Sequence, residues 1–498
     1  MTQHAILRDM ARGSAVMIVM RWSMRLIGLA STMILARLLT PLDFGVVAMA
    51  TVFVGFIELF SFMSFDLALI RIPEPDREDY DTAWTLQAIL GTVLSLVILA
   101  LAPVAAWYFS EPRLETVVRL LAVNSFLQGL SNIGLADFRR NLDFQRDLRF
   151  NVYSRLIVFV ATMAVAVPMR NYWALVTGLI VGNTARLILS YSMHPFRPRF
   201  GLTRSRQILS FSTWMLLFHI GTYVRNRLDT ILVARLTAAN SVGIYHVASE
   251  LAAMPTNELV VPTGRALFPA YAQLARDPQA LRVAFRAVLG FFFAVVLPIC
   301  AGTMAVAPYL VRVVLGAQWV DAAPLVSMLT FAGGFNAISH VIGTFHAAHG
   351  RERFSALLTW VNVAVLVPAL FLGAKYWGVP GIAGGRVLVG CLILALAIYS
   401  VACTTIVTGR DIAQVVWRPA VSALIMTAVV VGMRVEFTSP LASLIANVLV
   451  GGCSFVALSY GLWWLSGRPP SVESIILDFL NSRIRGRGSA RGLAIGND

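Results

Sequence analysis

The stretch Ala36–Val46 reads ARLLTPLDFGV, and the stretch Ala234–Ile244 repeats its outline as ARLTAANSVGI. In each, an Ala-Arg-Leu run is followed at the same spacing by a glycine, which is Gly45 in the first copy and Gly243 in the second. Two shorter pairs recur in the same order: Leu90-Gly91 with Leu289-Gly290, and Tyr172-Trp173 with Tyr376-Trp377. A membrane chain whose second half repeats its first is typical of carriers, in which two lobes move around a central site. The repeat therefore favours transport.

The composition is that of an integral membrane protein. Of the 498 residues, 58% are hydrophobic and only 13% are charged, and the mean hydropathy is +0.75. A soluble domain carries about 25% charged residues. Segments that cross a bilayer must contain few charged residues, because one charged side chain at its centre costs roughly 2.5–3.5 kcal/mol even on the mildest scale. We therefore expect the chain to span the membrane.

Apolar stretches of about 20 residues, long enough to cross a bilayer, occur about fourteen times. This pattern predicts an all-α polytopic membrane protein, and no loop is long enough to fold as a soluble domain. The expected spans lie near residues 13–38, 44–66, 83–108, 115–136, 149–168, 172–193, 208–235, 241–264, 284–306, 323–345, 354–373, 379–406, 412–433 and 441–465.

The net charge of +15 comes almost entirely from arginine, since Lys375 is the only lysine. A basic balance could indicate nucleic-acid binding, but these arginines gather in alternate loops. Positive charge on one side of a membrane explains that distribution, and it predicts an even number of crossings with both termini cytoplasmic. The positive side holds the N-terminus, the loop 70–82, Arg139 to Arg149, Arg197 to Arg206, Arg276 to Arg286, Arg351 with Arg353, Arg410 and the C-terminal tail.

The tail, residues 467–498, differs from the rest of the chain. Pro469-Pro470 ends the last span, and five apolar residues then fall on one helical face before a run of arginines. This pattern predicts a short amphipathic helix on the cytoplasmic leaflet, followed by a basic end. The residues are Val472, Ile475, Ile476, Phe479 and Leu480, then Arg483, Arg485, Arg487 and Arg491.

The first expected span contains two cations, Arg21 and Arg25, which are four residues apart and so share one helical face. Together they cost roughly 5–7 kcal/mol on the insertion scale, so they are not expected to face lipid. One interpretation is a cationic face toward an internal cavity, suited to a phosphate or a carboxylate. The other is that both lie near the cytoplasmic end and extend to the interface.

Other charges lie within expected spans. In the seventh, Arg225 and Asp229 are four apart and could neutralise each other, or they could form part of a ligand or ion site. Glu58 and Glu250, in the second and eighth, are isolated acids expected to be buried; each could pair with a cavity arginine, bind a coupling proton or cation, or hold helices together. Charges nearer span ends are expected to extend to the interface or lie in loops: Asp66, Asp137, Arg155, Arg186, Arg265 and Arg386.

No catalytic apparatus is visible in the sequence. There is no Ser/His/Asp cluster, no zinc signature and no pair of carboxylates on a large loop. His346 and His349 lie at a span end with no third ligand nearby in the sequence, so no metal site is expected. We therefore expect the protein not to be an enzyme and to carry no cofactor.

Several stretches, in order and spacing, resemble the polysaccharide transporter family of the MOP flippase superfamily, the Wzx-type exporters of bacterial surface glycans. The resemblance covers residues from about 12 to 465. The stretches are LARLLTPLDFG at 35–45, RRNLDF at 139–144, RNRLD at 225–229, GIY at 243–245 with Pro255 and Phe268-Pro269, and LGAQW at 315–319.

The resemblance implies two six-helix lobes around a central cavity, in residues 1–206 and 207–410, with two further helices in 411–466. It implies a flippase that moves undecaprenyl-pyrophosphate-linked oligosaccharides across the bacterial inner membrane by alternating access, for exopolysaccharide or lipopolysaccharide synthesis. Arginines such as Arg21, Arg25 and Arg225 suit a pyrophosphate. Coupling to H⁺ or Na⁺ is left open, with Glu58, Asp229 and Glu250 as candidates. Amide and aromatic side chains available for sugars are Asn124, Asn183, Asn336, Trp214 and Trp360.

Other interpretations of the sequence are kept open. One is a related carrier for a peptidoglycan precursor or a drug. Another is a membrane glycan polymerase or ligase, although the expected periplasmic loops are short and nearly free of arginine and histidine. Polymerase or export machinery could bind the cytoplasmic tail.

Overall fold

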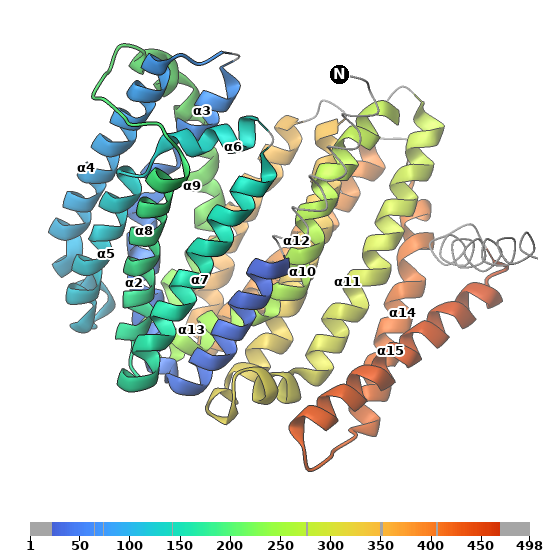
Figure 1. The fold of residues 1–498 in the computed structure, drawn as a ribbon. Helices are drawn as coiled ribbons and strands as arrows, with labels where there is room; N and C mark the ends of the chain where they lie inside the picture. The colour runs from blue at the N-terminus through green and yellow to red at the C-terminus, as the bar shows by residue number, and fades with distance from the viewer. Residues whose placement is uncertain are drawn as a thin grey trace, which may run out of the picture. The chain divides into compact units, whose positions relative to one another are not determined.

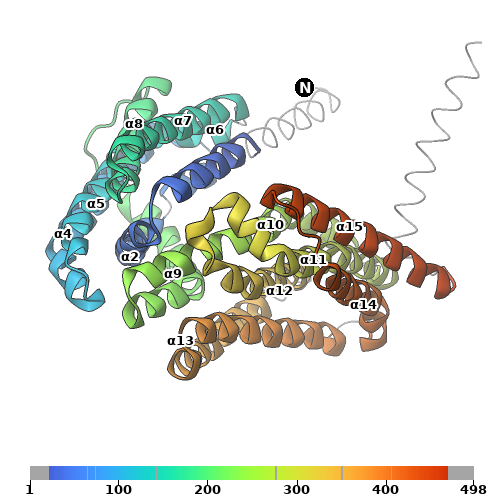
Figure 2. The ribbon, with the colours of Figure 1, turned by 90° about the horizontal axis from the view of Figure 1, so that it is seen from below.

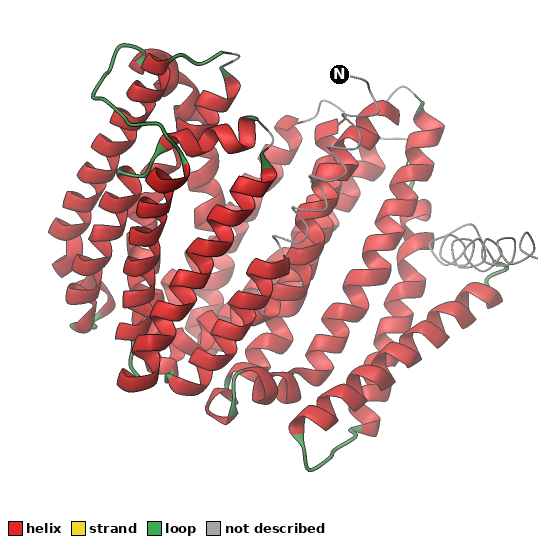
Figure 3. Ribbon diagram, viewed as in Figure 1, coloured by secondary structure: helices red, strands yellow, loops and turns green. Residues whose placement is uncertain are grey.

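The structure is a computed structural model that describes residues 22–63, 65–72, 74–141, 143–274, 277–348, 352–404 and 407–468. Within these ranges the chain is helical, without strands, and loops join the helices (Figure 3). The all-α prediction is confirmed. Arg21 and the basic tail from residue 469 onward lie outside the described residues.

The helices follow the expected spans in order (Figure 1). In the first half they are 22–38, α2 (Pro41–Ile57), η1 (Glu58–Met63), α3 (Phe65–Arg71), α4 (Arg77–Phe109), α5 (Arg113–Gly129), η2 (Ile133–Leu135), α6 (Ala136–Arg140), α7 (Phe144–Met169) and α8 (Trp173–Met193). In the second half they are α9 (Ser205–Leu236), α10 (Ala239–Leu274), α11 (Pro278–Val314), η3 (Ala317–Trp319), α12 (Ala322–Ala348), α13 (Glu352–Thr404), α14 (Gly409–Met433) and α15 (Pro440–Leu465).

The lengths of these helices agree with a polytopic membrane protein. Among the described residues, nine helices are long and apolar enough to cross a bilayer. One of them, α13, contains two expected spans, which meet at a kink at Gly378. The φ of Gly378 is 61°, a backbone conformation that glycine adopts readily and other residues rarely do.

The chain divides into two compact units by its internal contacts. The first comprises Met1–Val247 with Val314–Trp319, and the second comprises Ala248–Val313 with Val320–Asp498. Helix α9 belongs to the first unit, where it contacts η1, α2 and α4. The lobe boundaries that we inferred from the family resemblance stay predictions.

In the first unit, α4 pairs with α5 and α7 pairs with α8, and α5 also contacts α8 (Figure 2). Helix α2 begins at a capping box, in which Thr40 accepts from the Asp43 amide and Asp43 accepts from the Thr40 amide. The second oxygen of Asp43 accepts from the amide of Tyr172, 2.9 Å away, at the start of α8. One carboxylate thus caps α2 and fixes α8 beside it.

The two glycines of the sequence repeat meet where α2 crosses α10. A Cβ atom on Gly45 would lie 1.7 Å from the carbonyl oxygen of Ala239, and one on Gly243 would lie 1.8 Å from that of Pro41. No side chain fits between backbones this close, so each helix needs glycine at the same point of its first turns. The repeated spacing is explained by this contact.

The loop before α12 is held against the first helix. The indole of Trp319, which is fully buried, donates to the carbonyl oxygen of Ala36 over 2.7 Å and meets the ring of Phe44 edge-on at 5.2 Å. The Gln318 amide donates to the carbonyls of Ala36 and, over 2.9 Å, of Leu39. These donors satisfy carbonyls that the end of the first helix leaves unpaired.

The second unit has an aromatic core at one end of α10, α11 and α12. Phe345 packs against Phe285 and Tyr271, with ring centroids 4.3 and 5.3 Å apart. Nearby, Asp411 at the start of α14 receives Arg282 at 2.7 Å and Arg286 at 3.1 Å from α11. This ion cluster attaches the α14–α15 pair to α11.

We predict that Gly45→Ala destabilises the protein, because the added methyl group must displace the Ala239 carbonyl. Overpacking of this kind costs about 1–3 kcal/mol. Gly452→Ala is the matched control, since a Cβ on Gly452 meets nothing within 4 Å. Thermal unfolding of both variants in detergent measures the difference. Equal melting temperatures would contradict the proposed constraint.

Candidate functional site: a polar cavity in the first unit

A cavity of about 520 Å³ lies within the first unit, between η1, α3, α4, α5 and α8. Each long helix contributes one side of the cavity, mostly through residues three or four apart, which lie on the same face of a helix. The face of α4 is Gln87, Leu90, Gly91 and Leu94; that of α5 is Ser125, Leu127, Gln128 and Gly129, continued by Ser131; that of α8 is Asn183, Arg186 and Leu187. Glu58, Phe65 and Asp66 complete the wall.

A carboxylate lies in the wall of the cavity beside a hydroxyl. Glu58 begins η1, where the helix tightens after α2, and its side chain is half-buried. The hydroxyl of the buried Ser125 donates to Glu58 Oε1 over 2.5 Å. Such a hydrogen bond stabilises the charged form of Glu58, which the surrounding apolar helices would otherwise disfavour.

A second glycine pair brings the two helices of the cavity wall together. A Cβ on Gly91 of α4 would lie 2.6 Å from the Cα of Gly129 on α5. One turn away, the Gln87 amide donates to the carbonyls of Gln128 and Gly129 at 3.0 and 3.2 Å, and to Ser131 Oγ at 3.1 Å. Gln87 therefore satisfies carbonyls at the C-terminal end of α5 and fixes its position against α4.

The other charges of the wall lie on α8 and α3. The exposed Arg186 guanidinium lies 5.1 Å from the ring centroid of Phe150 on α7. Asp66 is half-buried, and Arg139 approaches it to 3.4 Å. The half-buried amide of Asn183 lies one turn before Arg186 on the same face. The wall thus offers two carboxylates, one guanidinium, several amides and two hydroxyls.

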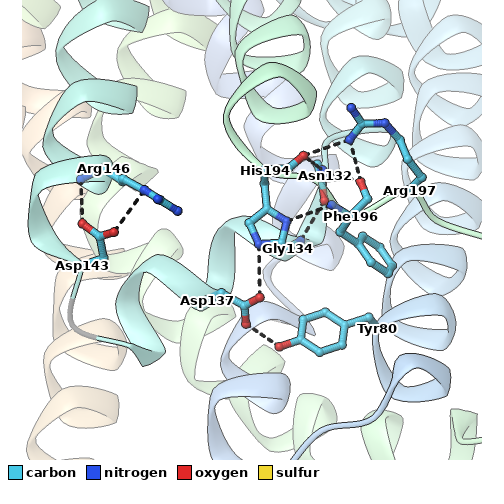
Figure 4. A network of polar contacts seen from close by, with 9 residues as sticks. All are labelled: Tyr80, Asn132, Gly134, Asp137, Asp143, Arg146, His194, Phe196 and Arg197. Carbon is cyan, nitrogen blue, oxygen red and sulfur yellow. Dashed lines mark hydrogen bonds and ion pairs between the residues drawn. The ribbon is translucent and has the colours of Figure 1, made fainter.

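A polar network holds together the ends of the same helices (Figure 4). Asp137 on α6 accepts from the Tyr80 hydroxyl of α4 and lies 3.2 Å from His194 Nε2, just after α8. The Asn132 amide donates to the carbonyl of Phe196 over 2.9 Å, while its oxygen accepts from the Gly134 amide. Burial lowers the pKa of His194, and the nearby Asp137 opposes that shift.

After this network the chain runs along α4. The Arg199 amide donates to Asp81, the Gly201 amide donates to Thr85 Oγ1, and Arg204 forms an ion pair with Asp76 at 2.8 Å. The connection between α8 and α9 is therefore bound to the first unit along its length rather than being a loose linker.

Of the predicted residues that the structure describes, Glu58 and Asn183 line the cavity. Arg25 and Arg225 are half-buried on the first helix and on α9. Asp229 is buried and accepts from the Tyr245 hydroxyl over 2.7 Å and from the Thr230 amide over 2.8 Å.

Two predicted residues lie in the second unit. The expectation that Glu250 is buried is wrong: its side chain is exposed on α10, on the face away from the buried Val247, Ala248, Leu251 and Ala252. Asn336 is exposed on α12, and its amide donates to the carbonyl of Ala332 over 2.9 Å. The side chains of Trp214 and Arg265, and His349, lie outside the described residues.

The sequence did not single out most of the cavity. Asp66 and Arg186 were predicted to extend to the interface or to lie in loops, and no role was predicted for Gln87, Gln128 or Ser125. A signal was present, because Gln87 and Gln128 are polar residues inside apolar stretches and Asn183 and Arg186 share a helical face. What the sequence lacks is the rotation of each helix about its axis.

The helical arrangement is shared with solved membrane transporters. The chain is similar to the solved structure "Lipid II flippase MurJ, inward closed conformation", with a TM-score of 0.73 and 12% identity, covering 89% of this chain and 98% of that one. It is also similar to an inward-facing multidrug resistance MATE transporter of the MOP superfamily, with a TM-score of 0.60 and 16% identity, covering 76% and 95%. The chain therefore has the fold of these two transporters.

The family follows from the sequence comparison. A family model described as "Polysaccharide biosynthesis protein" matches residues 34–324, more than half of the chain, and the chain belongs to that family. It is 24% identical to the lipopolysaccharide biosynthesis protein WzxC of Escherichia coli (strain K12), over 73% of this chain and 75% of that protein. It is 22% identical to the succinoglycan biosynthesis transport protein ExoT of Rhizobium meliloti (strain 1021), over 84% and 85%. The resemblance to the Wzx-type exporters is confirmed.

We predict that acid destabilises the first unit through His194. Its folded-state pKa lies below the unfolded value of about 6.5. Below that value the unfolded chain takes up the proton first, so stability present above about pH 6.5 is lost as the pH falls. The melting temperature of the native protein should fall more between pH 7.5 and pH 5.5 than that of His194→Gln. Parallel curves for the two proteins would contradict this.

Proposed function

We propose that this protein is a flippase that moves undecaprenyl-pyrophosphate-linked oligosaccharide units from the cytoplasmic to the periplasmic leaflet of the bacterial inner membrane. The observation that carries the proposal is the family match, which covers the α2–α10 crossing, together with the MOP carrier fold. Relatives named for lipopolysaccharide and succinoglycan synthesis point to surface or secreted glycans.

The chemistry of such a cargo suits the chain. A polyprenyl tail can stay in lipid while the headgroup crosses, so the protein must shelter only the pyrophosphate and the sugars. Guanidinium groups bind pyrophosphate through paired hydrogen bonds. Arg25 and Arg225, both half-buried within helices of the first unit, are the described candidates, with Arg21 beside Arg25 in the sequence.

The coupling ion is a separate part of the proposal. Asp229 already accepts hydrogen bonds from Tyr245 and Thr230, which favours a structural role. Glu58 lines a cavity and has a hydroxyl donor, which supports a proton or Na⁺ site that fills and empties during the cycle. The exposed Glu250 would bind a coupling ion only if water reaches it, because a charged side chain is unfavourable in lipid.

For the orientation we propose that both termini are cytoplasmic. The arginine-rich connection from Arg197 to Arg204 would then lie on the cytoplasmic side, as the positive-inside rule requires. The tail after residue 469 could bind polymerase or export proteins there. Family membership and the absence of a catalytic motif in the sequence favour transport without covalent chemistry on the cargo.

The experiment that tests the function uses a deletion strain. Lipid-linked oligosaccharides are extracted from it, and a periplasmic glycan-modifying enzyme reports which leaflet holds them. Cargo that accumulates unmodified, with modification restored by the native gene, supports the flippase. Cargo that is modified in the periplasm but stays unpolymerised would instead assign the protein to polymerisation.

We predict that Arg25→Ala lowers transport about tenfold to a hundredfold in the same assay, since a hydrogen bond to a charged group contributes about 1.5–3 kcal/mol. Arg410→Ala is the matched control, because Arg410 is exposed in the first turn of α14 and lies outside the proposed site. Membrane levels of both variants are measured by immunoblot. Native transport by Arg25→Ala would remove this arginine from the cargo path.

A further inference from the structure

We propose that the cavity of the first unit is a saccharide subsite, which binds an uncharged sugar of the cargo while the pyrophosphate is held elsewhere. This inference rests on the proposed function and adds to it the part of the cargo that the cavity recognises. It is carried by the size of the cavity, by the mixture of polar groups in its wall and by the rigidity of the helices around it.

The size of the cavity limits its occupant. Its volume of about 520 Å³ lies in the range of about 300–1,000 Å³ that is usual for small-molecule pockets. A single water occupies only about 30 Å³, so the space can hold a sugar residue as well as an ion at Glu58. Among the described residues, no group of three or more His, Cys, Asp and Glu side chains could hold a metal ion.

The polar groups of the wall exclude other parts of the cargo. Glu58 and Asp66 would repel a pyrophosphate, and Arg186 is the one guanidinium in the described wall. A polyprenyl chain is disfavoured because it would displace water from these polar side chains and offer them no hydrogen bond in return. Sugar hydroxyls both donate and accept, so they match a wall that mixes carboxylates, amides, hydroxyls and a guanidinium.

The charges of the wall also select among sugars. The wall carries two carboxylates, Glu58 and Asp66, and one guanidinium, Arg186, whereas Arg139, which approaches Asp66 to 3.4 Å, is not part of the wall. An acidic sugar would place a second carboxylate near Glu58 and Asp66, which repel it. The wall therefore favours uncharged sugars over uronic acids.

The position of the cavity within one unit has a mechanical consequence. All of its walls belong to the first unit, and three contacts hold them together: Gly91 against Gly129, the Gln87 amide against the end of α5, and the Asp137–His194 network. A site on such a rigid support keeps its geometry while other parts of a carrier move. The sugar would remain bound to one unit during a transport cycle.

The test measures binding of two lipids to the full-length protein in nanodiscs by native mass spectrometry. One is undecaprenyl pyrophosphate without sugar, and the other is the lipid-linked oligosaccharide extracted from the deletion strain. Asn183→Ala removes a hydrogen-bonding group of the wall, and Leu187→Trp fills the cavity without removing a polar group. Gln145→Ala, an exposed amide on α7 outside the cavity, is the matched control.

We expect Asn183→Ala to bind the sugar-bearing lipid about tenfold more weakly, as the loss of one or two hydrogen bonds implies. Leu187→Trp should weaken binding at least as much, because its indole occupies the space that the sugar needs. Their binding of undecaprenyl pyrophosphate should stay at the native level, and the control should match the native protein for both lipids. Melting temperatures identify a variant that fails to fold, and the other variant then carries the test.

Two results would overturn the subsite. Native affinity of both folded variants for the sugar-bearing lipid would show that the cavity does not bind the saccharide. Equal losses for both lipids would show that it acts on the shared pyrophosphate part. Either result leaves the flippase function standing, whereas a native protein that binds neither lipid would contradict the function itself.

Discussion

The crossing of α2 and α10 is the contact on which the first unit depends. Backbone meets backbone there, because Gly45 faces the Ala239 carbonyl and Gly243 faces that of Pro41. The crossing lies just after the capping box of α2 and just before Tyr245, whose hydroxyl binds the buried Asp229. A larger residue at either glycine would separate the helices and weaken the contacts around them. The repeated spacing in the sequence thus reflects a packing requirement that both halves share, namely a glycine where the two backbones meet.

A polar group buried within an apolar protein costs free energy unless it has a hydrogen-bonding partner. In the first unit most have partners: Gln87 binds the end of α5, Asp43 binds α8, and Asp137 binds Tyr80 and His194. The cavity is where carboxylate, amide and guanidinium groups gather around open volume. That arrangement suits a cargo with many hydroxyl groups. In our proposal it separates the recognition of sugar from that of pyrophosphate, which we assign to the arginines of the first helix and of α9.

The hydropathy of the chain predicted the order and approximate ends of the helices, because burial in lipid is a property of local composition. The first helix and α2 were among the helices that it located, and so were α9 and α10, which contain the repeated sequence. The individual site residues were predicted less completely. Glu58 was chosen for its isolation and lies in the cavity, whereas Asp66 and Arg186 were interpreted as interfacial charges. Glu250 was expected to be buried and is exposed. Local sequence specifies a helix but not its rotation against its neighbours.

The sequence by itself determined the membrane location, the all-helical class, the repeat and the family, since each depends on composition or on the order of residues along the chain. The tertiary structure alone decided which faces of α4, α5 and α8 enclose a cavity, and that the segment after α8 is bound to the first unit. Those features depend on backbone approaches such as Gly91 to Gly129, where residues far apart in the chain come within van der Waals contact.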